Sequence, residues 1–232
     1  MNRFLYTILL FLWMPGFYGN SVKEPDAIRI LETAKSNFKM IIDFTADVEI
    51  EINVDFINIP NKTARVIYKY PDKLKFKSKS FIMVPKKGIG FSVFELLESE
   101  YSAIYIGSRQ IKGRDLNEIK VIPMDDKSDI ALATLYIDLE DHLIHYMEAT
   151  TKKSGFFSTE FEYGKNAPLP ESNRIQFDVD EMRLPLKFLG KVNIDKSKIK
   201  ENSVGEIIIR YSNYIINQGL SDDQFEEEEL NE

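Results

Sequence analysis

Cysteine is absent from this chain of 232 residues, and histidine occurs only twice. Without cysteine the protein forms no disulfide, offers no thiolate to a metal and carries no lipid on an N-terminal cysteine. His142 and His145 are three residues apart in a predicted strand, where successive side chains point to opposite faces. The two imidazoles are therefore not expected to share a metal ion, and we expect neither a metal nor another cofactor.

An excess of basic residues is also lacking. The 37 acidic residues outnumber the 30 basic ones and give a formal net charge of −7. Nucleic-acid phosphates would repel such a protein, so we expect no nucleic-acid partner, and anionic lipid surfaces would not attract it. Part of the acidic excess lies in Glu226–Glu229, within a segment (residues 221–232) that we interpret as a solvated acidic tail.

Motifs for catalysis are missing as well. The chain has no Gly-x-Ser-x-Gly elbow and no Cys–His pair, and Lys87–Gly90 lacks the third glycine of a nucleotide-binding loop. Asp125, Asp126 and Asp129 could gather around Ca²⁺, but they lack the glycine and terminal glutamate of an EF-hand loop. We interpret these aspartates as a solvated turn, and we expect no enzymatic activity.

The apolar run near the N-terminus, Phe4–Met14, is too short to span a bilayer. It has eleven residues, whereas a transmembrane helix needs about 20. Arg3 precedes the run, and the small residues Gly19 and Ser21 follow it. This order is typical of a secretory signal peptide over residues 1–21, cleaved after one of these two small residues; an uncleaved anchor is the alternative. We expect an exported, soluble mature protein.

Alternation of apolar and polar residues is strongest between Phe44 and Phe56, where seven apolar residues occupy the even positions and six polar ones the odd. The pattern predicts an antiparallel strand with one apolar face and one solvated, acidic face. Thirteen residues at about 3.3 Å each span about 43 Å, and so long a strand indicates a bent or coiled sheet, such as an open or closed barrel. We expect these side chains to face the concave, apolar side: Ala46, Val48, Ile50, Ile52 and Val54.

Similar patterns predict further strands and two helices, and therefore a mainly β fold of about 10–11 antiparallel strands. Val66, Tyr68, Leu74 and Phe76 should join the apolar face. The later strands are expected near residues 101–106, 117–122, 131–138, 143–150, 156–163, 174–180 and 204–217.

A helix to about residue 43 carries an apolar stripe of Ala27, Leu31, Ala34, Phe38 and Ile41. Such a sheet encloses either a packed core or a ligand cavity, and periodicity does not separate the two.

A movable cover over this concave face is predicted around residues 81–98. Alternation is lost at Phe81–Val84, and Gly88 and Gly90 could act as hinges. A short amphipathic helix follows at residues 91–98. Its apolar side chains, which we expect to form the lid, are Phe91, Phe94 and Leu97.

Several stretches, taken in order, resemble the periplasmic lipoprotein carrier LolA and its relatives. They are the first helix running into DFTADVEIEI, then YPDKLKF at Tyr70–Phe76, the hairpin ATLYIDLEDHLIHYMEA at Ala133–Ala149, and the closing strand GEIIIRYSNYIINQGL at Gly205–Leu220. The resemblance covers most of residues 22–220. It implies an open half-barrel whose helices act as a lid over a hydrophobic cavity for acyl chains.

The resemblance also implies a function and partners. A LolA-like protein is a monomer that carries acylated lipoproteins or other lipids through the periplasm, from a releasing transporter in the inner membrane towards an acceptor at the outer membrane. Lys75 stands where the family has an arginine that is important for opening and closing the lid, and it would be the latch here. Two alternatives stay open, namely a lipid- or protein-sensing domain of an envelope-stress system and a structural domain with a packed core.

Overall fold

The computed structural model describes residues 26–55, 57–78, 92–153, 155–178, 193–194 and 203–226. The predicted signal peptide lies outside these residues, as do Phe81–Val84, Gly88, Gly90 and Phe91 of the predicted cover. Among the described residues, no helix is both long enough and apolar enough to cross a membrane.

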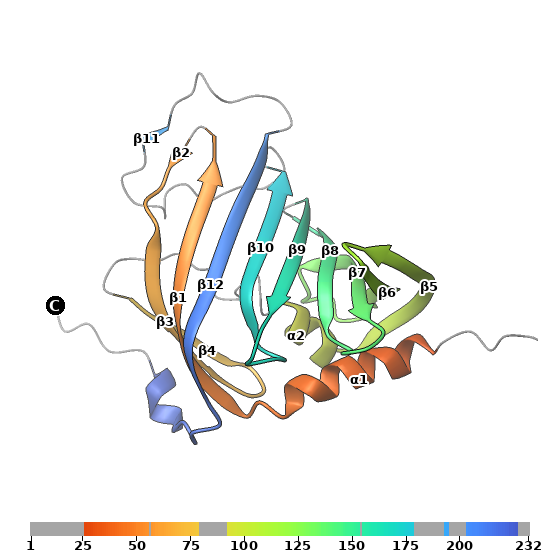
Figure 1. Cartoon of the computed structure of the whole chain (residues 1–232), viewed down its shortest axis with the longest axis horizontal. Helices are drawn as coiled ribbons and strands as arrows, with labels where there is room; N and C mark the ends of the chain where they lie inside the picture. Colours follow the sequence, from red (N-terminus) through yellow and green to blue (C-terminus); the bar gives the residue numbers. More distant parts are fainter. Residues whose placement is uncertain are drawn as a thin grey trace, which may run out of the picture.

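An antiparallel sheet makes up most of the described chain and stays open (Figure 1). Twelve described strands follow the order β11-β2-β1-β12-β10-β9-β8-β7-β6-β5, with β3 on β1 and β4 on β3. The prediction of a mainly β, open half-barrel is confirmed; two of the strands, β2 and β11, have only two residues each. The strands are β1 Asp43–Val54, β2 Ile57–Asn58, β3 Lys62–Lys69, β4 Lys73–Lys77, β5 Tyr101–Ile111, β6 Arg114–Pro123, β7 Ile130–Asp138, β8 Ile144–Thr151, β9 Phe156–Tyr163, β10 Pro170–Asp178, β11 Asn193–Ile194 and β12 Val204–Ile216.

The long strand β1 organises one half of the sheet because it pairs with β12 on one side and with β3 on the other. Ile50 lies opposite Ile209 of β12, and Ala46 lies opposite Val66 of β3. These four apolar side chains are buried on one face. Glu49, one residue away on β1, points to solvent on the other face, as the alternation predicts.

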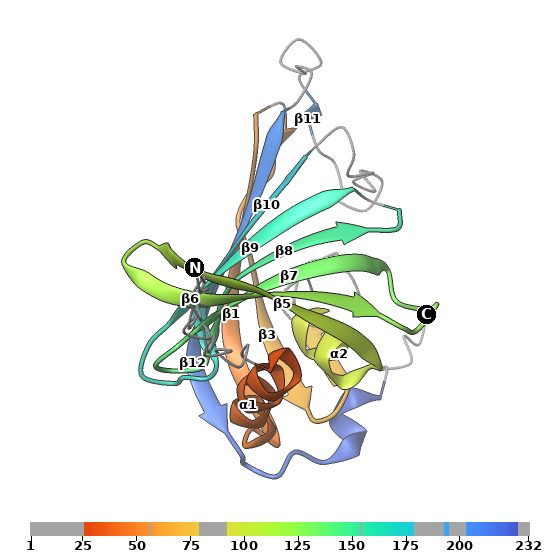
Figure 2. The ribbon, with the colours of Figure 1, turned by 90° about the vertical axis from the view of Figure 1, so that its right-hand side faces the viewer.

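In the described part of the chain, the helices α1 and α2 lie on the concave side of the sheet (Figure 2). The helix α1 spans Ala27–Lys39, and Asp26 caps its N-terminus by accepting the backbone N–H of Ile28 at 3.0 Å. The helix ends earlier than the expected residue 43 because β1 already begins at Asp43. The shorter helix α2 spans Ser92–Glu98. The whole apolar stripe predicted for α1 is buried: Ala27, Leu31, Ala34, Phe38 and Ile41.

After β12 the chain turns back and is held by Asp43 at the start of β1. The buried Asp43 carboxylate accepts the backbone N–H groups of Gln218, Gly219 and Leu220 at 2.9, 2.9 and 3.0 Å. A 3₁₀ helix, η3 (Asp222–Phe225), follows and lies beside β4 (Figure 1). Residues 221–226 of the predicted tail therefore pack against the sheet.

Candidate functional site

The side chains predicted to form an apolar face meet in one cluster. Ala46, Val48, Ile50, Val54 and Val66 are buried in it. Four other predicted residues, Ile52, Tyr68, Leu74 and Phe76, are half-buried and pack against it. The structure thus brings all nine together on the concave side, and their contact with lipid stays a prediction.

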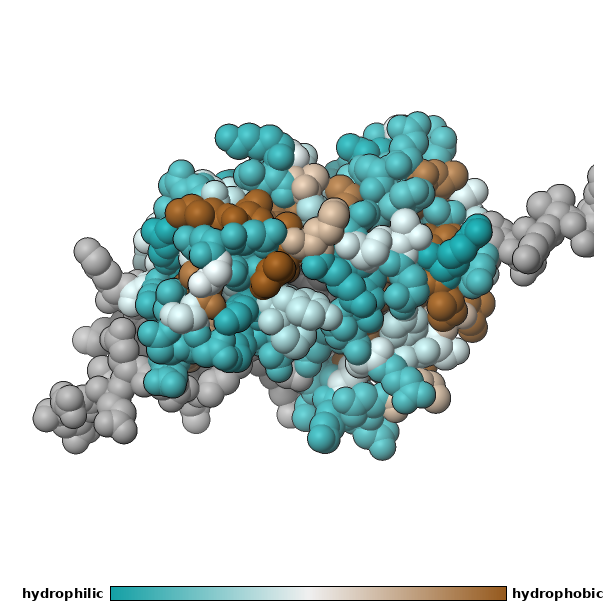
Figure 3. Space-filling view, turned by 90° about the horizontal axis from the view of Figure 1, so that it is seen from below, coloured by the Kyte–Doolittle hydropathy of each residue, from teal (hydrophilic) through white to brown (hydrophobic). Residues whose placement is uncertain are grey.

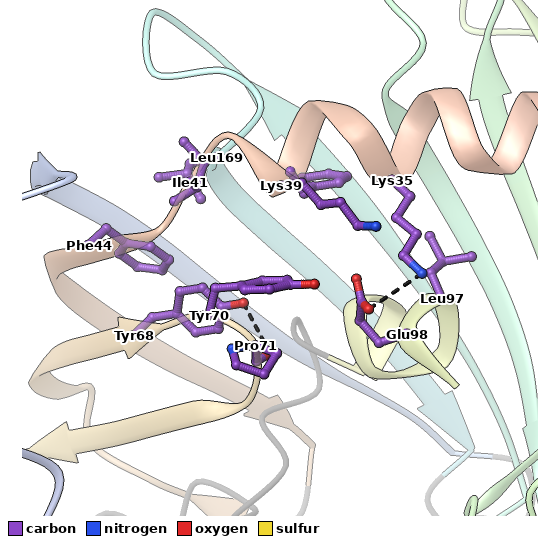
Figure 4. A pocket seen from close by; sticks show the side chains of 11 residues that line it. Lys35, Lys39, Ile41, Phe44, Tyr68, Tyr70, Pro71, Leu97, Glu98 and Leu169 are labelled. Atoms are coloured by element: carbon purple, nitrogen blue, oxygen red, sulfur yellow. Dashed lines mark hydrogen bonds and ion pairs between the residues drawn. The ribbon is translucent and has the colours of Figure 1, made fainter. Parts of the chain in front are cut away.

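A pocket opens at the lower end of this face, between α1, α2 and β3 (Figure 4). Its cavity volume is about 30 Å³. Ligand pockets typically have about 300–1,000 Å³, so this one is too small for a lipid chain in the described structure. Its lining residues are Lys35, Phe38, Lys39, Ile41, Phe44, Tyr68, Tyr70, Pro71, Leu97, Glu98 and Leu169.

An ion pair joins the two helices at the edge of the pocket. The ammonium group of Lys35 lies 3.4 Å from the carboxylate of Glu98 (Figure 4), and the Lys35 side chain is only 14% exposed. Sequence reasoning missed this pair, although a signal was present. Lys35 is four residues after Leu31 and three before Phe38, so a charged residue interrupts the apolar stripe of α1.

Apolar side chains also reach the surface beside the pocket. Met40 and Ile42, between α1 and β1, are 63% and 59% exposed, and Tyr70 is 37% exposed. The backbone N–H of Tyr70 donates to the carbonyl of Ile42 at 2.8 Å, so these two residues are neighbours. Seen from below, brown apolar surface borders a hollow near the centre of this face (Figure 3). The mouth of the pocket therefore has an apolar rim.

Aromatic rings lead from the pocket into the molecule. Phe44, which lines the pocket, has its ring centroid 5.2 Å from that of Tyr68 and 5.5 Å from that of Tyr214. Tyr214 stacks in turn on Tyr211 at 6.0 Å. Burial raises the pKa of Tyr68 to about 12 and also raises the pKa of Tyr211 and Tyr214, so all three hydroxyls stay neutral near pH 7.

Known structures show where else this fold occurs. Neither protein-family models nor curated proteins match the sequence. Among solved structures, a domain described as an outer membrane lipoprotein-sorting protein from Vibrio parahaemolyticus has a TM-score of 0.58 at 10% identity, covering 86% of this chain and 95% of that one. A LolA superfamily protein from Nitrosomonas europaea has a TM-score of 0.54 at 11% identity, covering 88% and 98%. A DUF1329 family protein from Desulfovibrio piger has a TM-score of 0.56 at 12% identity, covering 87% and 98%.

This chain has the LolA fold. Identities of 10–12% establish the fold alone, so the function has to be argued from the site.

Within the LolA fold, part of the predicted lid can be placed. Leu97 of α2 is 1% exposed and lines the pocket, whereas Phe91 and the side chain of Phe94 lie outside the described residues. The movement of this segment stays a prediction.

Lys75, the predicted latch of this LolA-like chain, lies on β4, and its role in moving the lid stays a prediction. It lies opposite Ile67 in the β3–β4 pairing. Lys75 and Ile67 each follow directly after a residue that points to the concave side, Leu74 and Val66. Because successive side chains of a strand point to opposite faces, Lys75 points to the convex side. Its ammonium group donates to the backbone carbonyl of Glu226. In the described structure Lys75 therefore holds the C-terminal segment, on the face away from the helices.

One further group of the LolA-like sheet has metal-ligand chemistry. Asp138, Asp141 and His145, at the β7–β8 turn, place potential ligand atoms within 4.8 Å of one another. Arg114 pairs with both carboxylates, at 3.2 and 3.6 Å, and His145 Nε2 lies 3.1 Å from Asp141. Burial raises the pKa of Asp138, but hydrogen bonds from the Glu140 and Asp141 amides and from Arg114 outweigh it and lower this pKa. We interpret the group as a charge-balanced turn.

Proposed function

We propose that this protein is a periplasmic carrier that binds the acyl chains of lipoproteins, or of other lipids, between its sheet and its helices, and moves them towards the outer membrane. The observation that carries the proposal is an apolar concave sheet face covered by two helices, with a small apolar pocket at their edge. The likeness to LolA-superfamily structures supports it at the level of the fold.

Energetics favour a carrier that opens and closes. Burying an acyl chain of about a dozen methylenes releases roughly 10 kcal/mol, at about 0.8 kcal/mol for each methylene. About 30 Å³ of free space does not admit such a chain, so uptake requires α1 or α2 to move. The seven-residue α2 is too short to be stable alone and depends on its packing, which makes it the easier element to displace.

Such a carrier needs no catalytic step. Uptake and release need only a shift between an open and a closed state, and bound lipid favours the closed state, in which α2 is packed again. The exposed rim of Met40, Ile42 and Tyr70 is the surface that we propose meets the donor or acceptor membrane protein. We accordingly propose a binding protein without enzymatic activity.

The test begins with the full chain expressed in a Gram-negative host and recovered from the periplasm. Native mass spectrometry should find an acylated species bound to the protein. Hydrogen exchange before and after delipidation should then show that α2 exchanges faster than β1 and is slowed by lipid. A stable protein partner without transferable lipid would favour the sensing domain instead.

A lock on the helices makes this test sharper. Because the chain has no cysteine, Lys35→Cys with Glu98→Cys introduces the only two thiols, and a reducible bifunctional reagent can join α1 to α2. Lipid uptake should stop when the link is made and return when it is reduced. Either single-cysteine variant, treated alike, is the control. Uptake that is unaffected by the link, or no acylated species at all, would contradict the proposal.

A further inference from the structure

Among the described residues, two buried side-chain oxygens on the concave side have no hydrogen-bond partner. They are Oγ1 of Thr159 on β9 and Oδ1 of Asn173 on β10, and each residue is only 1% exposed. Buried polar groups are nearly always paired, because leaving one unpaired costs its full desolvation. Two such atoms on neighbouring strands therefore require an explanation.

The register places both residues on the apolar face. Thr159 lies opposite Ile175 of β10, and Asn173 lies opposite Phe161 of β9. Thr159 and Asn173 are thus diagonal neighbours, a spacing of about 7–8 Å between Cα atoms in an antiparallel sheet. On their other sides they face Met147 of β8 and Ile209 of β12. The residues directly opposite them on the adjoining strands are thus all apolar and offer neither atom a side-chain partner.

Rotation of the Asn173 amide does not remove the problem. Its Nδ2 donates to the hydroxyl of Tyr211 at 3.2 Å. If the amide were turned over, Oδ1 would take this partner and Nδ2 would be left without one. One half of the Asn173 amide therefore remains available in either orientation.

The aromatic path described above connects this pair to the pocket. Phe44 lines the pocket, its ring contacts Tyr214, and Tyr214 stacks on Tyr211, which receives the Asn173 hydrogen bond. An acyl chain that enters beside Phe44 and extends along the concave face would run towards Asn173 and Thr159.

We propose that Thr159 and Asn173 form a polar subsite for a hydroxyl group carried on the bound acyl chain. A hydroxyl both donates and accepts, so a single one can donate to Asn173 Oδ1 and accept from the Thr159 hydroxyl. The inference rests on the proposed function and deepens it, because it names the cargo class as hydroxylated acyl chains. A plain chain would bury both polar atoms against methylenes, and the site would discriminate against it.

The experiment compares matched ligands on the delipidated full chain. The probes are myristic acid with 3-hydroxymyristic acid, and stearic acid with 12-hydroxystearic acid, which place the hydroxyl near either end of the chain. We expect the wild type to bind one hydroxylated member about tenfold more tightly than its plain partner, the size of effect that one or two neutral hydrogen bonds give.

Variants of equal size identify the groups responsible. Thr159→Val and Asn173→Leu should abolish the preference while leaving plain-chain affinity unchanged or higher, since an apolar isostere removes the unpaired atom. Ser158→Ala, on the convex side of the same strand, is the control and should keep the preference. Thr159→Val alone suffices if Asn173→Leu does not fold by circular dichroism.

The outcomes separate this inference from the proposed function. Equal binding of plain and hydroxylated chains by the wild type overturns the subsite and indicates that water satisfies the two atoms, while the carrier function stands. A preference that survives Thr159→Val and Asn173→Leu also overturns it. No binding of any of the four acids counts against the carrier function itself.

Discussion

Lys35 of α1 and Glu98 of α2 lie 3.4 Å apart, and this pair ties the first helix to the end of the second across the edge of the pocket. We predict that Glu98→Gln loosens α2 and accelerates its hydrogen exchange. The free energy of unfolding should fall by less than about 1 kcal/mol, because Glu98 is partly exposed and solvent screens the pair.

The matched control for this pair reverses both charges. Lys35→Glu with Glu98→Lys should bring α2 exchange back towards that of the wild type, since the attraction is restored with opposite sign. If Glu98→Gln left exchange at Val93–Leu97 unchanged, the ion pair would not restrain the helix.

A second prediction concerns the two faces of β1. Ile50 is buried on the concave side, whereas Glu49 is exposed and accepts a hydrogen bond from Asn61 at 3.0 Å. Ile50→Asp should cost more than about 4 kcal/mol of unfolding free energy or prevent folding, because it buries an unpaired charge. Glu49→Gln should change it by less than about 0.5 kcal/mol. Urea titration measures both, and equal effects would contradict the assignment of faces.

The sequence allowed this assignment because a period of two is a local property of the chain. Ala46, Val48 and Ile50 are buried where the alternation predicts them. Partners across the sheet are not local: β1 pairs with β12, more than 150 residues further along, and no periodic pattern specifies that neighbour. The contacts of Asp43 are not local either. The sequence predicts Asp43 as the end of a helix, whereas in the structure it binds the turn that follows β12.

Strand ends were predicted less well than strand centres. The strand β5 was expected to stop at residue 106, before Gly107 and Ser108, but it continues to Ile111 past an irregular register between Tyr105 and Gly107. The extension lies largely in solvent, so burial imposes no alternation on it. The Lys35–Glu98 ion pair was not predicted, because it forms between two helices whose packing the sequence does not specify.

A third prediction concerns acid. Hydrogen bonds from Lys69 and then Lys73, at 2.6 and 2.7 Å, lower the pKa of Asp222 from its usual 3.8 to about 2. A carboxyl whose pKa is depressed in the folded state stabilises that state above its unfolded pKa, and the contribution is lost as the pH falls through the folded value. The attachment of η3 to the sheet should therefore weaken between about pH 4 and pH 2.

Amide chemical shifts of Asp222–Phe225, followed by NMR from pH 6 to pH 1.5, report this release. Asp222→Asn should already show the released shifts at pH 6 and lose the titration step. An unchanged midpoint near 2 in that variant would show that another group is responsible.

The fourth prediction tests the C-terminal turn. Asp43 is 1% exposed and accepts three backbone N–H groups, from Gln218, Gly219 and Leu220. Hydrogen bonds to a charged group are worth about 1.5–3 kcal/mol each, so Asp43→Ala should lower the free energy of unfolding by at least about 3 kcal/mol. Asp43→Asn keeps one acceptor oxygen, so its free energy of unfolding should lie between those of the wild type and Asp43→Ala.

The control is Asp55→Ala, at an exposed aspartate just past the other end of β1, which should cost less than about 0.5 kcal/mol. Urea midpoints measured at pH 7 decide the matter: if Asp43→Ala lost no more stability than Asp55→Ala, the buried carboxylate would not be what holds the end of β12 to the start of β1.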